Sequence, residues 1–328
     1  MTARRQEPVR LGVIGLGSFG TLHALTVQGL AEAELVAVVA RREASLAAFA
    51  ARVPGVPGFL DLERAIAESG AEGWIVASAT ASHVPVTRRL LAAGRPVLLE
   101  KPIAASLDEA MQLEPLVAPA SRNLMLGHIL LFNSEFRQLQ AERRQRGPLV
   151  YIDAVRHRPT RTLELYPGES PFELTMTHDL YCVQALRDGA EPSRFAARVH
   201  RTADGRPDLA LAWLEWADGA MASLTASFLT PPGMAADGFD RLEVFGAGWM
   251  ARLQPNPRPI ELYDERASWP MALEIRADRE GPTGMLAEEL RCFCRVVRGT
   301  QPVPAGATYA DALQLMRWLA RLEAAAAA

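Results

Sequence analysis

The chain has 328 residues, of which 49% are hydrophobic and 22% are charged, so it has enough apolar material for two globular domains. Its formal net charge of -3 gives no general attraction for nucleic acid or for an anionic membrane surface, and neither partner is expected. No apolar run is long enough to span a bilayer, and the first ten residues are polar, so we expect a cytoplasmic protein. The cysteines lack the spacing of a zinc site, and we expect reduced thiols and no bound metal at Cys182, Cys292 and Cys294.

The first 127 residues alternate short apolar runs with amphipathic stretches, which is typical of a parallel sheet wrapped by helices. Helical stretches run over residues 46–52 and 84–93, and a capping box from Ser106 to Glu109 opens another. We therefore predict an α/β domain over residues 1–127, with a doubly wound parallel sheet. Its candidate strands are residues 10–14, 35–39, 74–77, 96–99 and 124–127.

A glycine-rich turn follows the first predicted strand and precedes a helix. In a G-x-G-x-x-G turn the first glycine permits tight backbone geometry, the second lets the backbone approach a pyrophosphate, and the third allows close helix packing. The free amides at the start of the helix then bind the phosphates. We predict a dinucleotide site here, formed by Gly15, Gly17, Ser18, Phe19 and Gly20.

The second predicted strand ends in Ala40-Arg41-Arg42. A site that prefers NAD(H) carries an Asp or Glu at this place, which accepts the ribose hydroxyls. Here no carboxylate can do so or repel a 2′-phosphate, whereas two guanidinium groups can bind one. The sequence therefore favours NADP(H), with NAD(H) as the alternative, and places Ala40, Arg41 and Arg42 at the cofactor. The other interpretation is that both arginines are solvated residues at a helix start.

Lys101 is the only lysine in the chain, and every other strongly basic side chain is arginine. It lies in Glu100-Lys101-Pro102, directly after the predicted strand at residues 96–99. A guanidinium group stays protonated, whereas a partly buried ammonium group can take part in proton transfer. The position therefore points to chemistry that arginine cannot perform, although compositional drift can also leave one lysine.

Beyond residue 128, longer alternating segments indicate a sheet with one buried face. We predict a second, α+β domain over residues 128–328, built on a large, open and predominantly antiparallel sheet. One broad face of this sheet needs a cover, so we expect a homodimer or homotetramer through it. Helices are predicted over residues 285–297 and 309–322, after which the alanine tail is expected to fray. The predicted strands are residues 150–155, 210–216, 220–228 and 241–245.

The order of motifs across nearly the whole chain resembles the Gfo/Idh/MocA family of oxidoreductases. Most of these motifs are weak alone, but Glu-Lys-Pro after such a strand, with the glycine turn upstream, is specific. The resemblance rests on Gly15-x-Gly17-x-x-Gly20, Ala79-Thr80-Ala81-Ser82-His83, Glu100-Lys101-Pro102, Gly127-His128 before Phe132-Asn133, His178-Asp179-Leu180 and Arg241-Leu242-Glu243-Val244-Phe245-Gly246.

The resemblance implies a Rossmann domain followed by a domain whose open sheet carries the substrate and the subunit contacts. It implies hydride transfer between NAD(P)(H) and a hydroxyl or carbonyl group of a small molecule, with sugar-derived compounds among the candidates. Lys101 would reach between nicotinamide and substrate, and His178 would handle the proton with it. His128 would shape the cofactor pocket, and no role follows for His23, His157 or His200. The resemblance also places Ala79, Thr80, His83, Glu100 and Lys101 around the cofactor.

The chain departs from the family pattern close to His178. An aspartate commonly lies four residues before this histidine, but the position is Leu174. Three alternatives stay open: Glu173 replaces the aspartate through a local shift, Tyr181 or a substrate group helps, or the usual chemistry is absent.

Two functions are therefore compatible with the sequence. The first is an NADP(H)-dependent oxidoreductase, and the second is a cofactor-binding regulatory or scaffold protein that has lost dehydrogenase activity. The missing aspartate favours the second function, and the retained Lys101 opposes it. The sequence does not determine the substrate, its stereochemistry, the reaction direction or the choice between dimer and tetramer. Three arginines could bind a substrate carboxylate or phosphate, or form a solvated strand edge: Arg156, Arg158 and Arg161.

Overall fold

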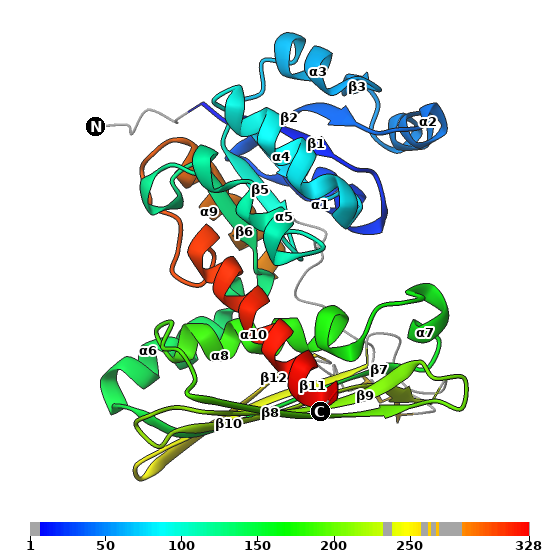
Figure 1. Ribbon diagram of the computed structural model, residues 1–328. Coiled ribbons are helices and arrows are strands. Elements are labelled where there is room, and N and C mark those ends of the chain that lie inside the picture. The colour runs from blue at the N-terminus through cyan, green and yellow to red at the C-terminus, as the bar shows by residue number, and fades with distance from the viewer. Residues whose placement is uncertain (1–6, 232–237, 257–261, 264–266, 269–283, 328) are drawn as a thin grey trace. The chain divides into compact units, whose positions relative to one another are not determined.

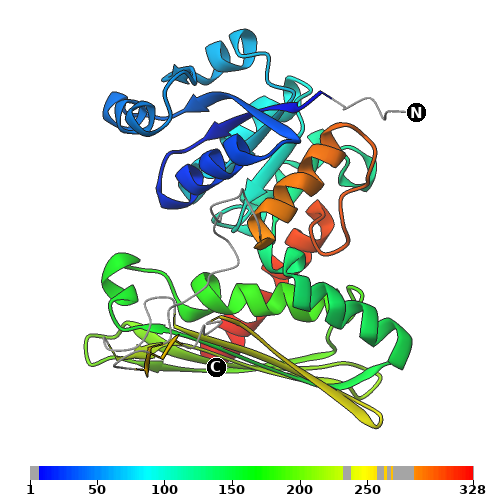
Figure 2. The same cartoon turned by 180° about the vertical axis from the view of Figure 1, so that it is seen from behind.

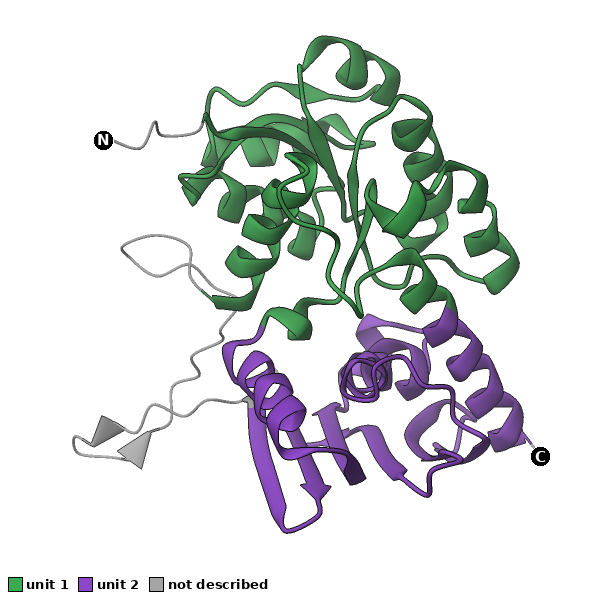
Figure 3. Ribbon diagram, turned by 90° about the vertical axis from the view of Figure 1, so that its left-hand side faces the viewer, with its two compact units in different colours: residues 1–132, 275–313 green, residues 133–274, 314–328 purple. Residues whose placement is uncertain are grey.

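The computed structural model describes residues 7–231, 238–256, 262–263, 267–268 and 284–327. The chain divides into two compact units, Met1–Phe132 with Ile275–Leu313, and Asn133–Glu274 with Gln314–Ala328 (Figure 3). Each unit has its own six-stranded sheet. No helix within the described ranges is both long enough and apolar enough to cross a bilayer.

The sheet of the first unit is parallel throughout, with the strand order β3-β2-β1-β4-β5-β6. The sequence predicts five of its strands and misses β3, whose two residues are too few to show a period. The order reverses between β1 and β4, which is the topological switch point where ligands bind in such sheets. The strands are β1 (Val9–Ile14), β2 (Ala33–Val39), β3 (Gly58–Phe59), β4 (Gly73–Val76), β5 (Val97–Glu100) and β6 (Leu124–Gly127).

Helices cover both faces of this sheet. The helix α4 (His83–Ala92) lies on the face towards the viewer in Figure 1, and α1 (Ser18–Gly29) and α9 (Gly284–Val297) lie on the other face, in front in Figure 2. Gly94, with φ +69°, follows α4 as predicted for a helix end. The remaining helices of the unit are α2 (Glu43–Arg52), α3 (Leu62–Glu68), α5 (Leu107–Met111) and the first turn of α10 (Tyr309–Ala327).

The capping box before α5 is present in a modified form. The Ser106 hydroxyl accepts a hydrogen bond from the Glu109 amide at 3.2 Å. The Glu109 carboxylate accepts one from the amide of Ala105, at 3.0 Å, rather than from that of Ser106. The first bond satisfies an amide of the first helical turn, and the second satisfies the amide of the residue before the N-cap.

The units differ from the predicted domains in one respect. The observed boundary at residue 132 lies close to the predicted one at 127, but α9 and the start of α10 belong to the first unit. A side chain at Gly73 of β4 would meet Val297 of α9 at 2.7 Å and Phe293 at 3.3 Å. The apolar stripe of α9 therefore packs on the parallel sheet, whereas the sequence pattern predicts a helix without showing which sheet it covers.

The sheet of the second unit is predominantly antiparallel, with the order β12-β11-β7-β10-β9-β8. Only the pairing of β10 with β7 is parallel. This mixed sheet and the parallel sheet of the first unit confirm the predicted fold class. Its strands are β7 (Leu149–Pro159), β8 (Arg194–Arg201), β9 (Pro207–Glu215), β10 (Met221–Thr230), β11 (Phe239–Gly246) and β12 (Trp249–Asn256), and a separate hairpin joins β13 (Leu262–Tyr263) to β14 (Ala267–Ser268).

Within the second unit, α6 (Ser134–Arg146) and α8 (Thr177–Leu186) lie on one face of the sheet (Figures 1 and 2). A π-helical segment, η5 (Phe172–Met176), leads into α8, and the short α7 (Thr162–Leu165) precedes it. The helix α10 continues to Ala327, so the prediction that it frays after Leu322 is wrong. Alanine has the highest helix propensity of all residues, which allows the tail to extend the helix.

Candidate active site

The glycine turn joins β1 to α1 at the carboxyl edge of the parallel sheet. Gly15 has a φ of +95°, and a side chain there would meet the carbonyl oxygen of Ala77 at 2.6 Å. A side chain at Gly20 would collide with the carbonyl oxygen of Gly15. Nothing lies within 4 Å of the Cβ position at Gly17. Gly15 and Gly20 therefore serve the fold, whereas Gly17 leaves space for a ligand to approach the backbone.

The start of α1 suits a pyrophosphate. Gly17 is the N-cap residue, and no side chain caps this helix end. The first turn, which begins with Ser18 and Phe19, therefore directs backbone amides at the open space beside Gly17. The predicted turn residues thus fit a dinucleotide.

Arg42, the second of the two arginines after β2, lines a cavity. Arg41 and Arg42 are both exposed, and Arg42 is the N-cap residue of α2. The cavity has a volume of about 330 Å³ and is lined by Leu16 of the glycine turn and by Arg42, Ser45 and Arg52. None of its lining residues is acidic. It therefore presents cationic and hydroxyl donors next to the dinucleotide turn.

The loop after β4 is tied to the loop after β5. Ala79 and Thr80 lie at the start of the 3₁₀ helix η1 (Thr80–Ser82). The ring of His83, only 1% exposed, has Nδ1 at 2.7 Å from the Pro102 carbonyl oxygen and Nε2 at 2.9 Å from that of Ser78. His83 therefore links two neighbouring loops of the candidate site through backbone contacts.

Glu100 is the last residue of β5, and the half-buried Lys101 follows it at the carboxyl edge. The Lys101–Pro102 peptide bond is cis. The Glu100 carboxylate lies 2.7 Å from Nε2 of His23 and accepts the Lys101 amide at 3.3 Å. It is therefore engaged with His23 and with the Lys101 backbone inside the unit.

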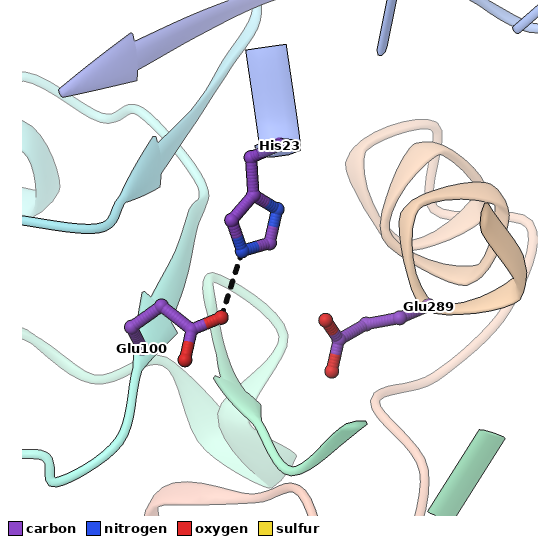
Figure 4. A group of neighbouring side chains, drawn as sticks. All are labelled: His23, Glu100 and Glu289. Carbon is purple, nitrogen blue, oxygen red and sulfur yellow. Dashed lines mark hydrogen bonds and ion pairs between the residues drawn. The ribbon is translucent and has the colours of Figure 1, made fainter. Parts of the chain in front are cut away.

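Two residues of this region have no predicted role, although both are completely buried. His23 of α1 pairs with Glu100, and the carboxylate of Glu289 on α9 points towards that pair (Figure 4). A sequence signal exists for both, because each polar side chain occupies the buried stripe of an amphipathic helix. His128, also predicted near the cofactor, is buried with Nδ1 at 2.6 Å from the Gly306 carbonyl oxygen, and burial lowers its pKa.

His178 is half-buried near the start of α8 in the second unit. Its Nδ1 lies 2.9 Å from the hydroxyl of the fully buried Tyr181. The Glu173 carboxylate is exposed and accepts hydrogen bonds at 3.2 Å from the amide and hydroxyl of Ser170. Of the two protein side chains considered in place of an aspartate at Leu174, Tyr181 is therefore the one seen in contact with the imidazole.

A buried ion cluster includes Asp179, the residue that follows His178. Arg156 donates to both oxygens of Asp179, at 2.8 and 2.9 Å, and to Asp240 at 2.6 Å. Arg158 donates to Asp240 at 2.6 Å. Burial alone would lower the pKa of Arg156, but the charges of Asp179 and Asp240 raise it. The prediction that Arg156 and Arg158 bind a substrate anion is therefore wrong, whereas the exposed Arg161 is not tested.

Lys101 belongs to the first unit and His178 to the second. Within the first unit, the structure brings together the ends of three adjacent strands. The glycine turn follows β1, Ala79 and Thr80 follow β4, and Lys101 follows β5. In a parallel sheet these ends share one edge, so the predicted cofactor residues lie around the switch point.

Comparisons with known proteins agree with this arrangement. A family model described as "Oxidoreductase family, NAD-binding Rossmann fold" matches residues 9–128. Inositol 2-dehydrogenase 1 of Saccharopolyspora erythraea is 30% identical over 199 residues, 59% of this chain and 58% of that protein. The rhizopine catabolism protein MocA of Rhizobium meliloti is 26% identical over 317 residues, 93% of this chain and 90% of that protein. Against the inositol 2-dehydrogenases of Leifsonia xyli and Corynebacterium glutamicum, the chain spans only about half of their length, 46% and 47%.

The fold also matches solved structures over nearly its whole length. Scyllo-inositol dehydrogenase from Lactobacillus casei, solved with NAD(H) and scyllo-inositol, superposes with a TM-score of 0.82 at 19% identity, covering 97% of this chain and 96% of that one. GenD2 from gentamicin A biosynthesis, solved with NAD, gives 0.80 at 22% identity, covering 99% and 96%. Residues 9–128 therefore match the Gfo/Idh/MocA family of oxidoreductases, and the fold of these solved structures extends over nearly the whole chain.

Proposed function

We propose that the chain is an NADP(H)-dependent oxidoreductase that transfers a hydride between the cofactor and a CH–OH or carbonyl group of a small polyol. The observation that carries the proposal is the position of Lys101 at the carboxyl end of β5. The glycine turn and the loop after β4 lie at the same edge, around the switch point. A polyol is supported by the relatives named inositol 2-dehydrogenase.

Oxidation of a CH–OH group needs an acceptor for the hydride that leaves the carbon atom and an acceptor for the proton that leaves its hydroxyl oxygen. When bound, the nicotinamide ring supplies or accepts the hydride. The hydroxyl proton goes to His178, whose Nδ1 is held by Tyr181, so Nε2 exchanges the proton. The Lys101 ammonium group hydrogen-bonds the reacting oxygen, stabilises its developing negative charge and relays the proton between that oxygen and His178, which a guanidinium group cannot do. In the reduction direction His178 returns the proton.

The preference for NADP(H) rests on the cavity beside α2. Arg42 and Arg52 line it together with Ser45. None of its lining residues is acidic, so none would repel a 2′-phosphate. Arg41 adds a second exposed guanidinium group next to Arg42. We expect a lower dissociation constant for NADPH than for NADH by fluorescence titration. Tighter binding of NADH would contradict this preference.

The decisive experiment follows NADP(H) absorbance over a panel of inositols, other polyols, sugars, keto acids and imines. Lys101→Arg retains the positive charge but cannot give up a proton at neutral pH. We expect this variant to fold and bind cofactor normally and to lose turnover by about 10²–10³-fold, within the range of general acid–base effects. Full activity of Lys101→Arg would refute the role given to Lys101.

A second candidate function is a cofactor-binding regulatory or scaffold protein without turnover, and Leu174 is the observation that favours it. Dinucleotide binding without conversion of any compound in the panel would support that function. Turnover that depends on Lys101 would exclude it.

We also propose that the second unit forms a homodimer or homotetramer through the face of its sheet opposite α6 and α8. Large apolar side chains stand exposed on three neighbouring strands, and Trp213 of β9 is 53% exposed. At the middle of that face, Asp153 accepts hydrogen bonds from Ser223 at 2.8 Å and from Arg241 at 2.7 Å. We expect light scattering to show two or four subunits and Trp213→Glu to weaken the assembly. A monomeric wild-type chain at micromolar concentration would refute it. The exposed apolar residues on this sheet include Val150, Leu211, Trp213 and Met221.

A further inference from the structure

Three ionisable side chains meet inside the first unit (Figure 4). His23 comes from α1, Glu100 from the end of β5 and Glu289 from α9. One nitrogen or oxygen atom of each lies within 4.8 Å of the other two. His23 and Glu289 are 0% exposed, and Glu100 is 8% exposed. The cluster is therefore a shared, water-excluded environment rather than a set of separate contacts.

Glu100 has defined partners in this cluster, whereas Glu289 does not. The Glu100 carboxylate contacts His23 at 2.7 Å and the Lys101 amide at 3.3 Å. It also lies directly over Gly127, where a Cβ atom would meet its oxygen at 2.8 Å. Neither oxygen of Glu289 has a hydrogen-bond partner among the described residues, and Nδ1 of His23 has none. The buried Glu289 carboxyl group therefore has no described hydrogen bond that would stabilise a negative charge on it.

Two ionised carboxylates cannot stand together here without a large cost, because burial removes water and the two charges repel. Burial, followed by the nearby charge of Glu100, raises the pKa of Glu289 well above its usual range. The other charged groups near α9 do not offset this repulsion. Glu288 and Glu32 both pair with Arg291, and His128 is held neutral by its burial. The proton is therefore placed on Glu289.

We propose that Glu289 is a positioning residue for Lys101, which acts as a neutral carboxylic acid beside the His23–Glu100 pair. In this state Glu100 is the only anion of the cluster, so it stays bonded to His23 and to the Lys101 amide. Ionisation of Glu289 would drive Glu100 away from these partners and displace the start of the Glu-Lys-Pro loop. The effect on catalysis rests on the function proposed above for Lys101, whereas the protonation of Glu289 does not.

The first test measures urea unfolding between pH 5 and pH 9 for the wild-type chain, Glu289→Gln and the matched control Glu288→Gln. Glu288 is half-buried one position earlier on α9 and pairs with Arg291 at 2.7 Å. The folded chain holds the Glu289 proton to a higher pH than the unfolded chain does. Wild type therefore loses stability as the pH rises above the ordinary carboxyl pKa of 4.5 towards the raised one.

Glutamine cannot ionise, so Glu289→Gln lacks this loss. The ratio of folded to unfolded wild type should fall relative to Glu289→Gln by up to about tenfold for each pH unit in that window. Glu288→Gln should follow wild type. If Glu289→Gln does not fold, Glu289→Met tests the same pH dependence, because it is also unable to ionise. A stability difference that does not change with pH would overturn the proposal.

The second test compares turnover and metal content. We expect Glu289→Gln to keep kcat within about threefold of wild type at pH 7 and to retain activity at alkaline pH where wild type declines. If the turnover of wild type and of Glu289→Gln declines alike at alkaline pH, Glu289 does not position Lys101. Absence of turnover with every substrate would instead count against the proposed function, and the unfolding test still decides the protonation of Glu289. A stoichiometric divalent metal in the purified wild type that is lost in Glu289→Gln would also overturn the proposal.

Discussion

The two residues proposed to handle the proton are supported in different ways. Lys101 follows a buried strand and lies in a loop whose backbone is bonded to His83 and Glu100. His178 lies near the start of a helix and contacts Tyr181 one turn later. The next residue, Asp179, accepts two hydrogen bonds from Arg156 of β7. The first support is mainly backbone, and the second is a network of side chains from distant segments.

This difference teaches what each half of the site tolerates. Where backbone segments approach closely, as at Gly15 and Gly20, added volume is the damaging change. Where buried charges neutralise one another, as at Arg156, removal of one charge is the damaging change. Substitutions that conserve size should therefore be harmless in one region and harmful in the other.

The largest effect on stability is expected at the ion cluster. Asp240→Asn conserves the size of the side chain but leaves the buried Arg156 with one carboxylate and removes the charged partner of Arg158. Breaking a buried pair in this way costs about 3–5 kcal/mol of unfolding free energy. Urea unfolding measures the loss, and Asp204→Asn, which alters the exposed pair with Arg206, should leave stability unchanged. Equal stability of both variants would show that the cluster does not hold the second unit together.

A smaller effect separates two glycines of the same turn. Gly20→Ala places a methyl group against the Gly15 carbonyl oxygen and should lower the unfolding free energy by about 1–3 kcal/mol. Gly17→Ala meets no atom within 4 Å and should unfold like wild type. The same methyl group would obstruct a pyrophosphate, so Gly17→Ala should raise the cofactor dissociation constant about tenfold or more. Unchanged cofactor binding by Gly17→Ala would contradict the placement of the pyrophosphate.

The backbone-built half of the site can be predicted because its signals are local. The glycine turn, the end of β2 and Glu100-Lys101-Pro102 each lie within a few consecutive residues. Their strand context follows from short apolar runs, and parallel strands bring their ends to one edge. The predicted fold class is confirmed, and residues 9–128, which contain these motifs, match the family model.

The side-chain-built half could not be predicted, because its partners are distant in the sequence. Arg156 of β7 and Asp240 of β11 are 84 residues apart and lie opposite each other in the sheet. Arg156 continues the buried alternate positions Ile152 and Ala154 of β7, and a buried arginine needs an anionic partner. The alternation of β7 could have indicated that Arg156 is not free for substrate, but not that Asp179 and Asp240 are its partners.

The smallest effect tests whether Tyr181 takes over part of the role of the aspartate missing at Leu174. Tyr181→Phe removes the hydroxyl that lies 2.9 Å from Nδ1 of His178 and leaves the ring in place. One hydrogen bond contributes about 0.5–1.5 kcal/mol, so kcat should fall by about three- to tenfold while the cofactor dissociation constant is unchanged. Tyr151→Phe is the matched control, because its hydroxyl contacts Asp153 at 3.3 Å on the sheet and not the imidazole. If both variants turn over like wild type, Tyr181 does not orient His178.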